Sequence, residues 1–63
     1  MSAVDPRFSR LRHDLANPLA AILAETQLLL LDNTTLDDET RRALETIEAM
    51  SMKMREILRG TAT

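Results

Sequence analysis

Apolar residues at heptad spacing constrain the fold of this chain more than any other feature of its sequence. In the first half, steps of three and four residues connect Phe8, Leu11, Leu15, Leu19, Ile22, Thr26 and Leu29. In the second half, the same steps connect Leu36, Thr40, Ala43, Ile47, Met50, Met54, Ile57 and Thr61. Such spacing places one stripe along an α-helix and is typical of helical bundles. The sequence therefore predicts two amphipathic helices with long apolar seams.

Capping and turn residues mark where these helices begin and end. We expect helix one at about residues 6–31, a turn at 32–35 and helix two at about 36–59, all within one domain that covers residues 1–63. Asp5 can cap the first helix and Pro6 suits its first position, while Thr35 or Asp37 can cap the second. A connection this short predicts an antiparallel hairpin.

The small size of the chain predicts that one hairpin cannot cover its own apolar surface. A chain of 63 residues without cysteine has no disulfide framework, and its single histidine excludes a zinc site of the usual kind within one chain. Further apolar side chains widen the two seams: Leu23, Leu30, Leu44, Met52 and Leu58. A second copy is the simplest cover, so we predict an all-α homodimer in which two hairpins form a four-helix bundle.

Composition and charge narrow the cellular setting and the class of partner. The net charge is −2 and Phe8 is the only aromatic residue, which argues against nucleic-acid binding. No run of 18 apolar residues is present, so neither a membrane span nor a signal peptide is expected. We therefore expect a cytoplasmic segment without membrane contact, whether or not a longer parent protein is anchored in a membrane.

The most unusual segment is residues 11–19, because it contains the only histidine, His13, followed by Asp14, Asn17 and Pro18. With Phe8 and Leu15 in the seam, His13 falls on the opposite, solvent-facing side of the helix. A neutral imidazole is a competent nucleophile near neutral pH, although a lone exposed histidine is more often an ordinary surface residue. Asn17 and Pro18 could instead start a new helix and leave His13 in a loop. The seam continues across Pro18, which favours one helix, bent at that proline.

The run His13-Asp14-Leu15-Ala16-Asn17-Pro18-Leu19 resembles the H-box of bacterial sensor histidine kinases. This box lies in their dimerisation and histidine-phosphotransfer domain of the HisKA type, and the resemblance covers roughly residues 8 to 59. Arg12 differs from the family, which more often has a small residue before the histidine. The resemblance implies a homodimeric domain of a protein histidine kinase, a phosphotransferase of two-component signalling.

The same resemblance implies a role for each polar residue of the box. His13 would accept the γ-phosphoryl group of ATP and pass it to an aspartate of a response-regulator receiver domain. Asp14 would be the general base for that step, and Asn17 would position a water for dephosphorylation of the regulator. Pro18 would be the hinge used in signalling.

No Gly-rich nucleotide loop or other ATP-binding motif is present in the sequence, so we expect no cofactor or metal to be bound by this chain. ATP would act as phosphodonor through a separate catalytic ATP-binding domain, and the chain alone should be inactive. It is either a domain excised from a larger kinase, which the short length and the ending favour, or a stand-alone phosphotransfer protein.

Basic residues near both ends of the chain suggest a further interaction. Folding the hairpin brings Lys53 and Arg55 toward the part of helix one that carries Arg10 and Arg12, and these four residues could contact a partner, with Arg7 and Arg59 nearby. The alternative is that the arginines of helix two merely suit the negative end of its dipole.

Two other classes of function remain open from the residues themselves. A purely structural dimerisation module needs the same two seams but gives no reason for His-Asp-x-x-Asn-Pro-Leu, and it takes second place. A small RNA-binding hairpin dimer would need a basic face with an aromatic side chain for stacking. Because Phe8 lies in the seam and the chain is acidic, that class takes third place.

Overall fold

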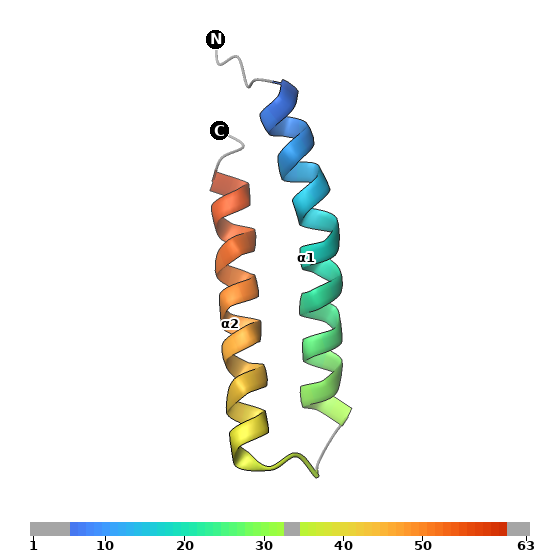
Figure 1. Cartoon of the computed structure of the whole chain (residues 1–63), viewed down its shortest axis with the longest axis vertical. Coiled ribbons are helices and arrows are strands. Elements are labelled where there is room, and N and C mark those ends of the chain that lie inside the picture. Colours follow the sequence, from blue (N-terminus) through green and yellow to red (C-terminus); the bar gives the residue numbers. More distant parts are fainter. Residues whose placement is uncertain (1–5, 33–34, 61–63) are drawn as a thin grey trace.

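Two antiparallel helices form a hairpin and lie side by side along their length (Figure 1). The computed structural model describes residues 6–32 and 35–60. Helix α1 spans Pro6–Asp32 and helix α2 spans Asp38–Gly60. The prediction of an all-α antiparallel hairpin is therefore confirmed.

Helix α1 begins at Pro6, and its 27 residues continue through Pro18 without a break. Proline suits the first helical position because the N–H that it lacks would have no partner there. The predicted cap, Asp5, lies outside the described residues. Since α1 is continuous, the alternative in which Asn17 and Pro18 start a new helix is wrong, and His13 lies on a helix rather than in a loop.

Helix α2 begins at Asp38, two residues later than the predicted start at residue 36. The reason is the cap: the backbone N–H of Thr40 donates a 2.7 Å hydrogen bond to Asp37 Oδ1, and the N–H of Arg41 donates a 2.9 Å bond to the Asp37 carbonyl. Of the two residues predicted to cap this helix, Asp37 is the one that does so. Asp38 and Glu39 follow in the first turn, where the helix dipole favours carboxylates.

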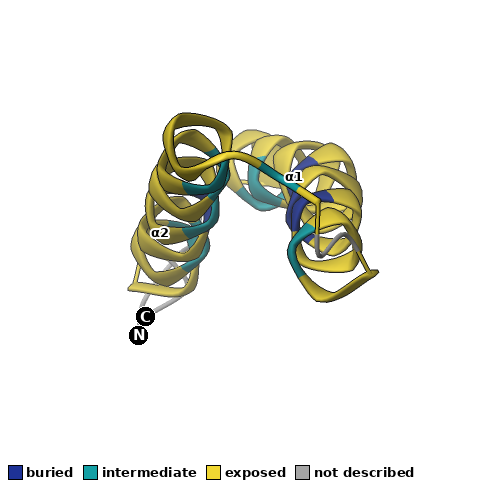
Figure 2. Ribbon diagram, turned by 90° about the horizontal axis from the view of Figure 1, so that it is seen from below, coloured by how far each residue is buried: buried dark blue, intermediate teal, exposed yellow. Residues whose placement is uncertain are grey.

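The interface between the two helices is narrow and partly polar. Leu19 and Leu23 of α1 are its buried apolar residues, and Thr26 and Ser51 are buried beside them (Figure 2). The Thr26 hydroxyl donates a 2.7 Å hydrogen bond to the Ile22 carbonyl, so this buried hydroxyl is satisfied within its own helix. Half-buried side chains extend the interface at both ends: Leu30 in α1, and Leu44, Glu48, Arg55 and Leu58 in α2.

The predicted seams mostly do not form this interface. Phe8, Leu15 and Leu29 of α1 are exposed, as are the heptad residues of α2: Ala43, Ile47, Met50, Met54 and Ile57. The contact between the two helices is instead made largely by four residues that we predicted only to widen the seams: Leu23, Leu30, Leu44 and Leu58. In α2, each residue that faces α1 comes one position after a heptad residue. Since consecutive helical residues are about 100° apart, the apolar heptad stripe of α2 points about 100° away from the direction of α1.

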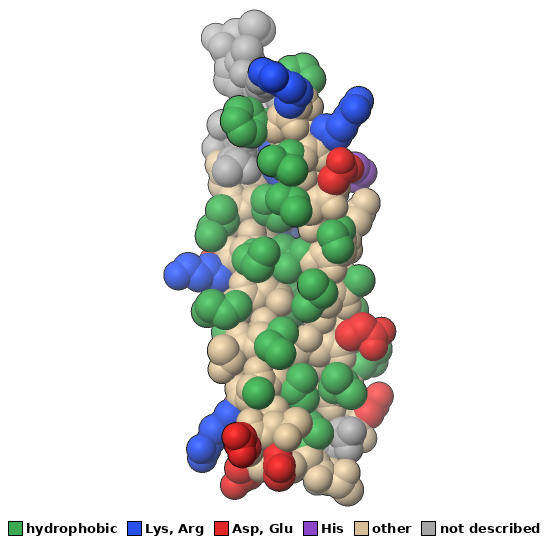
Figure 3. Space-filling view, viewed as in Figure 1, with side chains coloured by type: hydrophobic (Ala, Val, Ile, Leu, Met, Phe, Trp, Pro, Cys, Tyr) green, Lys and Arg blue, Asp and Glu red, His purple; other side chains and the backbone are tan. Residues whose placement is uncertain are grey.

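The exposed apolar side chains gather on one face that includes both helices (Figure 3). We call this surface the heptad face and define it by the exposed seam residues Phe8, Leu11, Leu15, Ile22, Leu29, Ile47, Met50, Met54 and Ile57. Its side chains keep between 43% and 66% of their surface exposed. Soluble monomers rarely leave so continuous an apolar surface uncovered.

The molecule is a rod rather than a sphere. Its Cα radius of gyration is 15.0 Å, whereas about 11 Å is usual for a compact domain of this length. By length and composition alone, α1 could also cross a membrane. The same length and composition occur in helices of soluble bundles, where other helices cover the apolar side.

Candidate functional site

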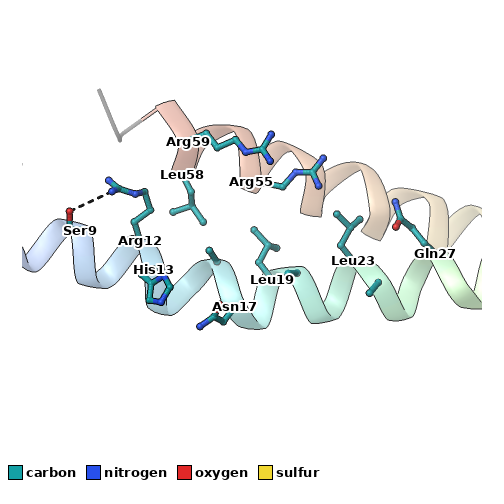
Figure 4. A pocket seen from close by; sticks show the side chains of 13 residues that line it. Ser9, Arg12, His13, Asn17, Leu19, Leu23, Gln27, Arg55, Leu58 and Arg59 are labelled. Carbon is teal, nitrogen blue, oxygen red and sulfur yellow. Dashed lines mark hydrogen bonds between the residues drawn. The ribbon is translucent and has the colours of Figure 1, made fainter.

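His13 lies on the exposed surface of α1, in the turn before Asn17. The two side chains point the same way, away from α2 (Figure 4). Residues four apart on a helix are neighbours on its surface, so the imidazole and the amide can act on one bound group. His13 is therefore accessible to a large reactant, and Asn17 is the polar side chain one turn below it.

Asp14 lies on a different side of α1 from this pair. It lines a shallow surface pocket with Pro6, Arg7, Arg10 and Leu11, and it is absent from the groove that His13 and Asn17 line. Consecutive helical residues are separated by about 100° around the axis, which accounts for the difference. Asp14 is exposed and is next to His13 in sequence, but it is not on the same face of the helix.

Although their side chains point away from α2, His13 and Asn17 also contribute to the lining of a groove between the two helices. Its volume is about 730 Å³, and we call it the histidine groove. On α1 its lining includes three small side chains at four-residue spacing, Ala16, Ala20 and Ala24, next to His13 and Asn17. Its α2 wall consists of Arg55, Leu58 and Arg59. The alanines leave room along α1, so a partner could approach the helix backbone closely.

The basic residues predicted to bind a partner do not all lie together. Arg12 and Arg55 line the histidine groove, and Arg59 lines it with them. Arg10 lies with Asp14 in the separate shallow pocket, and Lys53 is exposed on α2 without lining the groove. The predicted basic residues therefore fall into two sets. Arg12 and Arg55, together with Arg59, form the groove set, whereas Arg10 and Lys53 lie outside the groove.

Two guanidinium nitrogens of the groove set are buried without a hydrogen-bond partner among the described residues, Nη1 of Arg12 and Nε of Arg55. Arg12 donates one long hydrogen bond, 3.5 Å from its Nη2 to the Ser9 hydroxyl. Asp and Glu are absent from the residues that line the groove. The residues that line the groove therefore include three arginines and no carboxylate.

Pro18 lies between the histidine groove and the heptad face. It lines a small apolar pocket of about 260 Å³ together with Leu15, Ile22, Met54 and Ile57. Because proline has no N–H, the Asp14 carbonyl one turn earlier lacks its helical partner. The helix is thus weakened next to His13, while a bend at Pro18 stays a prediction.

Sequence reasoning did not single out the alanines or Gln27 at the lower end of the groove. Their four-residue spacing below the histidine was a usable signal: Ala16, Ala20 and Ala24 lie on the same side of α1. A group of His, Cys, Asp and Glu residues able to hold a metal ion is absent from the described part of the chain.

An antiparallel helical hairpin with one exposed histidine beside an amide and an uncovered apolar face has the architecture expected of a phosphoacceptor and dimerisation domain. The chain belongs to the family of the His Kinase A (phospho-acceptor) domain, whose model matches residues 8–61. Domains of this family homodimerise and work with the catalytic domains of histidine kinases, which are transferases of two-component signalling. No curated protein and no solved structure matches the chain.

Proposed function

We propose that His13 is the phosphoacceptor of this HisKA domain. The carrying observation is that His13, the only histidine of the chain, is exposed at the groove between the two helices of a family whose defining activity is phosphoacceptance. A catalytic domain must bring the γ-phosphate of ATP in line with the ring nitrogen, and an outward-facing imidazole permits that approach. Phosphoryl transfer depends mainly on such positioning and on charge.

The first transfer forms a bond between a ring nitrogen of His13 and the γ-phosphorus. The bond from that phosphorus to the β,γ-bridging oxygen breaks, and ADP leaves. Asp14 takes the proton that the ring loses; its position next to His13 in sequence supports this role. ATP and the residues that bind it belong to a separate catalytic domain.

The second transfer passes the phosphoryl group to an aspartate of a response-regulator receiver domain. The aspartate oxygen bonds to phosphorus as the N–P bond breaks, and the ring nitrogen regains a proton. Asn17 assists the dephosphorylation of the regulator. Its amide, one turn from His13 on the same face, can orient a water toward the phosphorylated regulator.

The heptad face supports homodimerisation of this hairpin into a four-helix bundle. Each helix has an uncovered apolar stripe, and two-fold pairing would bury both stripes of both copies together. Among residues 6–32 and 35–60, Leu19 and Leu23 are the only buried apolar side chains of one hairpin, which is a very small core for independent folding. Folding and dimerisation are therefore coupled.

The test of the phosphoacceptor uses radiolabelled ATP and the catalytic domain of a candidate histidine kinase. The chain is compared with its His13→Gln variant, which keeps a polar side chain without a nucleophilic nitrogen. The proposal expects acid-labile, alkali-stable label on the unaltered chain only. Equal labelling of both chains, or of neither with the cognate catalytic domain, would refute it.

A purely structural dimerisation module is the alternative, favoured by the same heptad face. It predicts that His13→Ala leaves every activity of the parent protein intact. Loss of signalling with an unchanged dimer would exclude it.

A further inference from the structure

Ser9 and Arg12 form a hydrogen-bonded pair in the turn of α1 that precedes His13. The Arg12 guanidinium donates a 3.5 Å hydrogen bond from its Nη2 to the Ser9 hydroxyl, and Figure 4 shows the Arg12 side chain extending toward Ser9. Both residues are half-buried, and both line the histidine groove together with His13. A cation and a hydroxyl group are therefore held together in the turn next to the imidazole.

Helix geometry brings His13 to this pair. Ser9 lies three residues before Arg12 and four residues before His13. Residues three and four apart are neighbours on a helix surface, so Ser9 adjoins both side chains. Helical side chains also lean toward the N-terminus and cover the turn before their own Cα. A group attached to the His13 ring would consequently lie over the turn that holds the Ser9 hydroxyl and the Arg12 guanidinium.

The hydrogen-bonding capacity of Arg12 is only partly used. Its bond to Ser9 is long for an N–H···O contact, and its Nη1 is buried without a hydrogen-bond partner among residues 6–32 and 35–60. A buried donor without a partner is unfavourable, and an anion with several oxygens would satisfy it. A phosphoryl group is such an anion, and the planar guanidinium fork can bind two of its oxygens at once.

The other charged residues near His13 are placed differently. Figure 4 shows Arg55 and Arg59 of α2 extending along the groove in the direction opposite to Arg12. Asp14 lines the separate shallow pocket on another side of α1, so it does not neutralise Arg12 within the groove. Among the arginines that line the groove, Arg12 is therefore the one that extends toward the turn covered by His13.

We propose that Ser9 and Arg12 bind the phosphoryl group carried on His13 and protect it from hydrolysis until the acceptor protein arrives. This inference rests on the proposed phosphorylation of His13. The Arg12 guanidinium and the Ser9 hydroxyl donate hydrogen bonds to the phosphoryl oxygens. Arg12 stands where the family more often has a small residue, so the site is a property of this chain rather than of the family.

The reaction that the site slows is attack by water on the phosphorylated ring. The water oxygen bonds to phosphorus as the N–P bond breaks, inorganic phosphate leaves, and the ring nitrogen keeps a proton. This reaction is faster when the ring is already protonated, because the imidazole then leaves as a neutral molecule. A guanidinium close to the ring disfavours that protonation, so Arg12 should lengthen the lifetime of the phosphohistidine.

Chemical phosphorylation tests the site without a kinase. Phosphoramidate phosphorylates a neutral imidazole in water: the ring nitrogen bonds to phosphorus, and ammonia leaves. His13 is the only histidine, so one phosphohistidine forms. After removal of the reagent, phosphorus NMR follows its decay at pH 7 in the folded dimer. Arg12→Gln should shorten the half-life by about three- to tenfold, the effect of losing one charge-assisted hydrogen bond.

Two further variants examine the parts of the pair. Arg12→Lys keeps the charge without the planar fork, so its half-life should lie between those of Arg12→Gln and the unaltered chain. Ser9→Ala removes the hydroxyl that holds the guanidinium and should shorten the half-life by about two- to threefold. If Arg12→Gln does not remain a folded dimer, these two variants decide the result by the same criteria.

The matched control is Arg10→Gln. It removes the same charge two positions earlier, about 200° around the helix, from a residue that lines the separate shallow pocket. Its half-life should stay within about 1.5-fold of that of the unaltered chain. Circular dichroism and light scattering verify that each variant is a folded dimer.

A pH titration by phosphorus NMR distinguishes binding from a merely structural role. A bound cation lowers the pKa of the phosphoryl group, because it favours the doubly charged form. Arg12→Gln should therefore raise this pKa by at least about 0.3, whereas Arg10→Gln should leave it within about 0.1 of the value in the unaltered chain.

The outcomes separate this inference from the proposed function. Equal half-lives and equal phosphoryl pKa values in Arg12→Gln and the unaltered chain would overturn the inference, as would equal losses in Arg12→Gln and Arg10→Gln. Either result leaves the phosphoacceptor proposal standing. If the cognate catalytic domain never labels His13, the phosphoacceptor proposal fails, and the chemically phosphorylated chain still decides whether Ser9 and Arg12 bind the phosphoryl group.

Discussion

The polar residues around His13 divide into two groups because they lie at different angles on one helix. His13 and Asn17 share the side of α1 that lines the histidine groove, whereas Asp14 lies with Arg10 in a separate shallow pocket. A water held by Asn17 would therefore be near a phosphoryl group that approaches along the groove. In its proposed role as the base, Asp14 would have to reach the ring from the side, because consecutive helical residues are about 100° apart.

Replacing Asn17 by Ala should separate the two activities. Phosphorylation of His13 by the catalytic domain should stay within about threefold of the unaltered chain, while dephosphorylation of the regulator should fall by about a hundredfold, the loss typical of a missing water-orienting group. Both rates are measured with labelled phosphate. The reverse pattern, normal dephosphorylation with lost phosphorylation, would contradict the role given to Asn17.

Asp37 makes the stability of α2 depend on pH. The hydrogen bonds that Asp37 accepts from Thr40 lower the pKa of this carboxyl below its ordinary value of 3.8. A carboxyl with a lowered pKa contributes stability above its unfolded-state pKa and loses it as pH falls through the folded-state pKa. This part of the stability should therefore be complete at neutral pH and disappear below about pH 4.

The cap is tested with Asp37→Ala and Asp37→Asn. The alanine variant should unfold at a lower temperature at pH 7, because the Thr40 N–H loses its acceptor. The asparagine variant keeps a capping oxygen without the charge, so its melting temperature should change less between pH 7 and pH 3 than that of the unaltered chain. An alanine variant as stable as the unaltered chain would show that the cap is unimportant.

At the level of the element, α1 combines the proposed phosphoacceptor with a local weakness. Pro18 interrupts the hydrogen bonding of the helix immediately after the segment that carries His13. The side chain of Pro18 also contributes to the apolar pocket beside the heptad face. A change in packing at that face could therefore alter the direction of the N-terminal part of α1.

Pro18→Ala should strengthen α1. Interior proline costs a helix about 3 kcal/mol relative to alanine, so the free energy of unfolding should rise by about 1–3 kcal/mol, less whatever packing the ring supplies. Urea unfolding of the dimer measures the change, and Ala21→Ser, at an exposed position of the same helix, should stay within about 0.5 kcal/mol. A variant less stable than the unaltered chain would mean that packing of the proline ring outweighs its backbone cost.

The helices were predictable from sequence because their periodicity and caps agree. The continuity of α1 across Pro18 followed from the same seam. The pairing of faces was not predictable, because a heptad gives the direction of an apolar stripe on one helix and not the element that covers it. In α2 the inward side includes Glu48, Ser51 and Arg55, which no hydrophobic pattern would assign to an interface.

At the level of the whole molecule, the hairpin has the properties of half a bundle. The chain exposes 5176 Å² of surface, whereas a compact monomer of this mass exposes about 4,100 Å². The elongated shape follows from two long helices lying side by side, and the heptad face is exposed because the apolar stripes of α1 and α2 point toward a common side. A second copy placed on that side would give each stripe a cover.

Two methionines of α2 provide a matched test of dimerisation. Met54 belongs to the heptad face and is 51% exposed, whereas Met52 is 42% exposed and lies outside it. Met54→Glu should shift the chain toward unfolded monomer at micromolar concentration, because dimerisation would bury a charged carboxylate of each copy in an apolar interface. Met52→Glu should remain dimeric.

Light scattering after size exclusion measures the mass, and circular dichroism measures helix content. A folded monomer of the unaltered chain at micromolar concentration would contradict the bundle, as would equal behaviour of the two methionine variants.

The candidate site was predictable only in part. The exposure of His13 followed from its position opposite the seam, and the structure has it exposed. The grouping of the basic residues was not predictable, because the exact register of α2 against α1 decides which arginines line the groove. Arg10 and Lys53 lie outside the groove because each is about 200° around its own helix from the groove residue two positions later, while Arg59 lies in it.

The most direct test of phosphotransfer is a pulse–chase experiment on the labelled chain. The chain is labelled on His13 by a catalytic domain, separated from ATP, and mixed with purified receiver domains one at a time. The account predicts that label leaves the chain within seconds to minutes for a cognate receiver and appears there as an alkali-labile acyl phosphate. Label that remains on the chain with every receiver of its own cell would contradict the account.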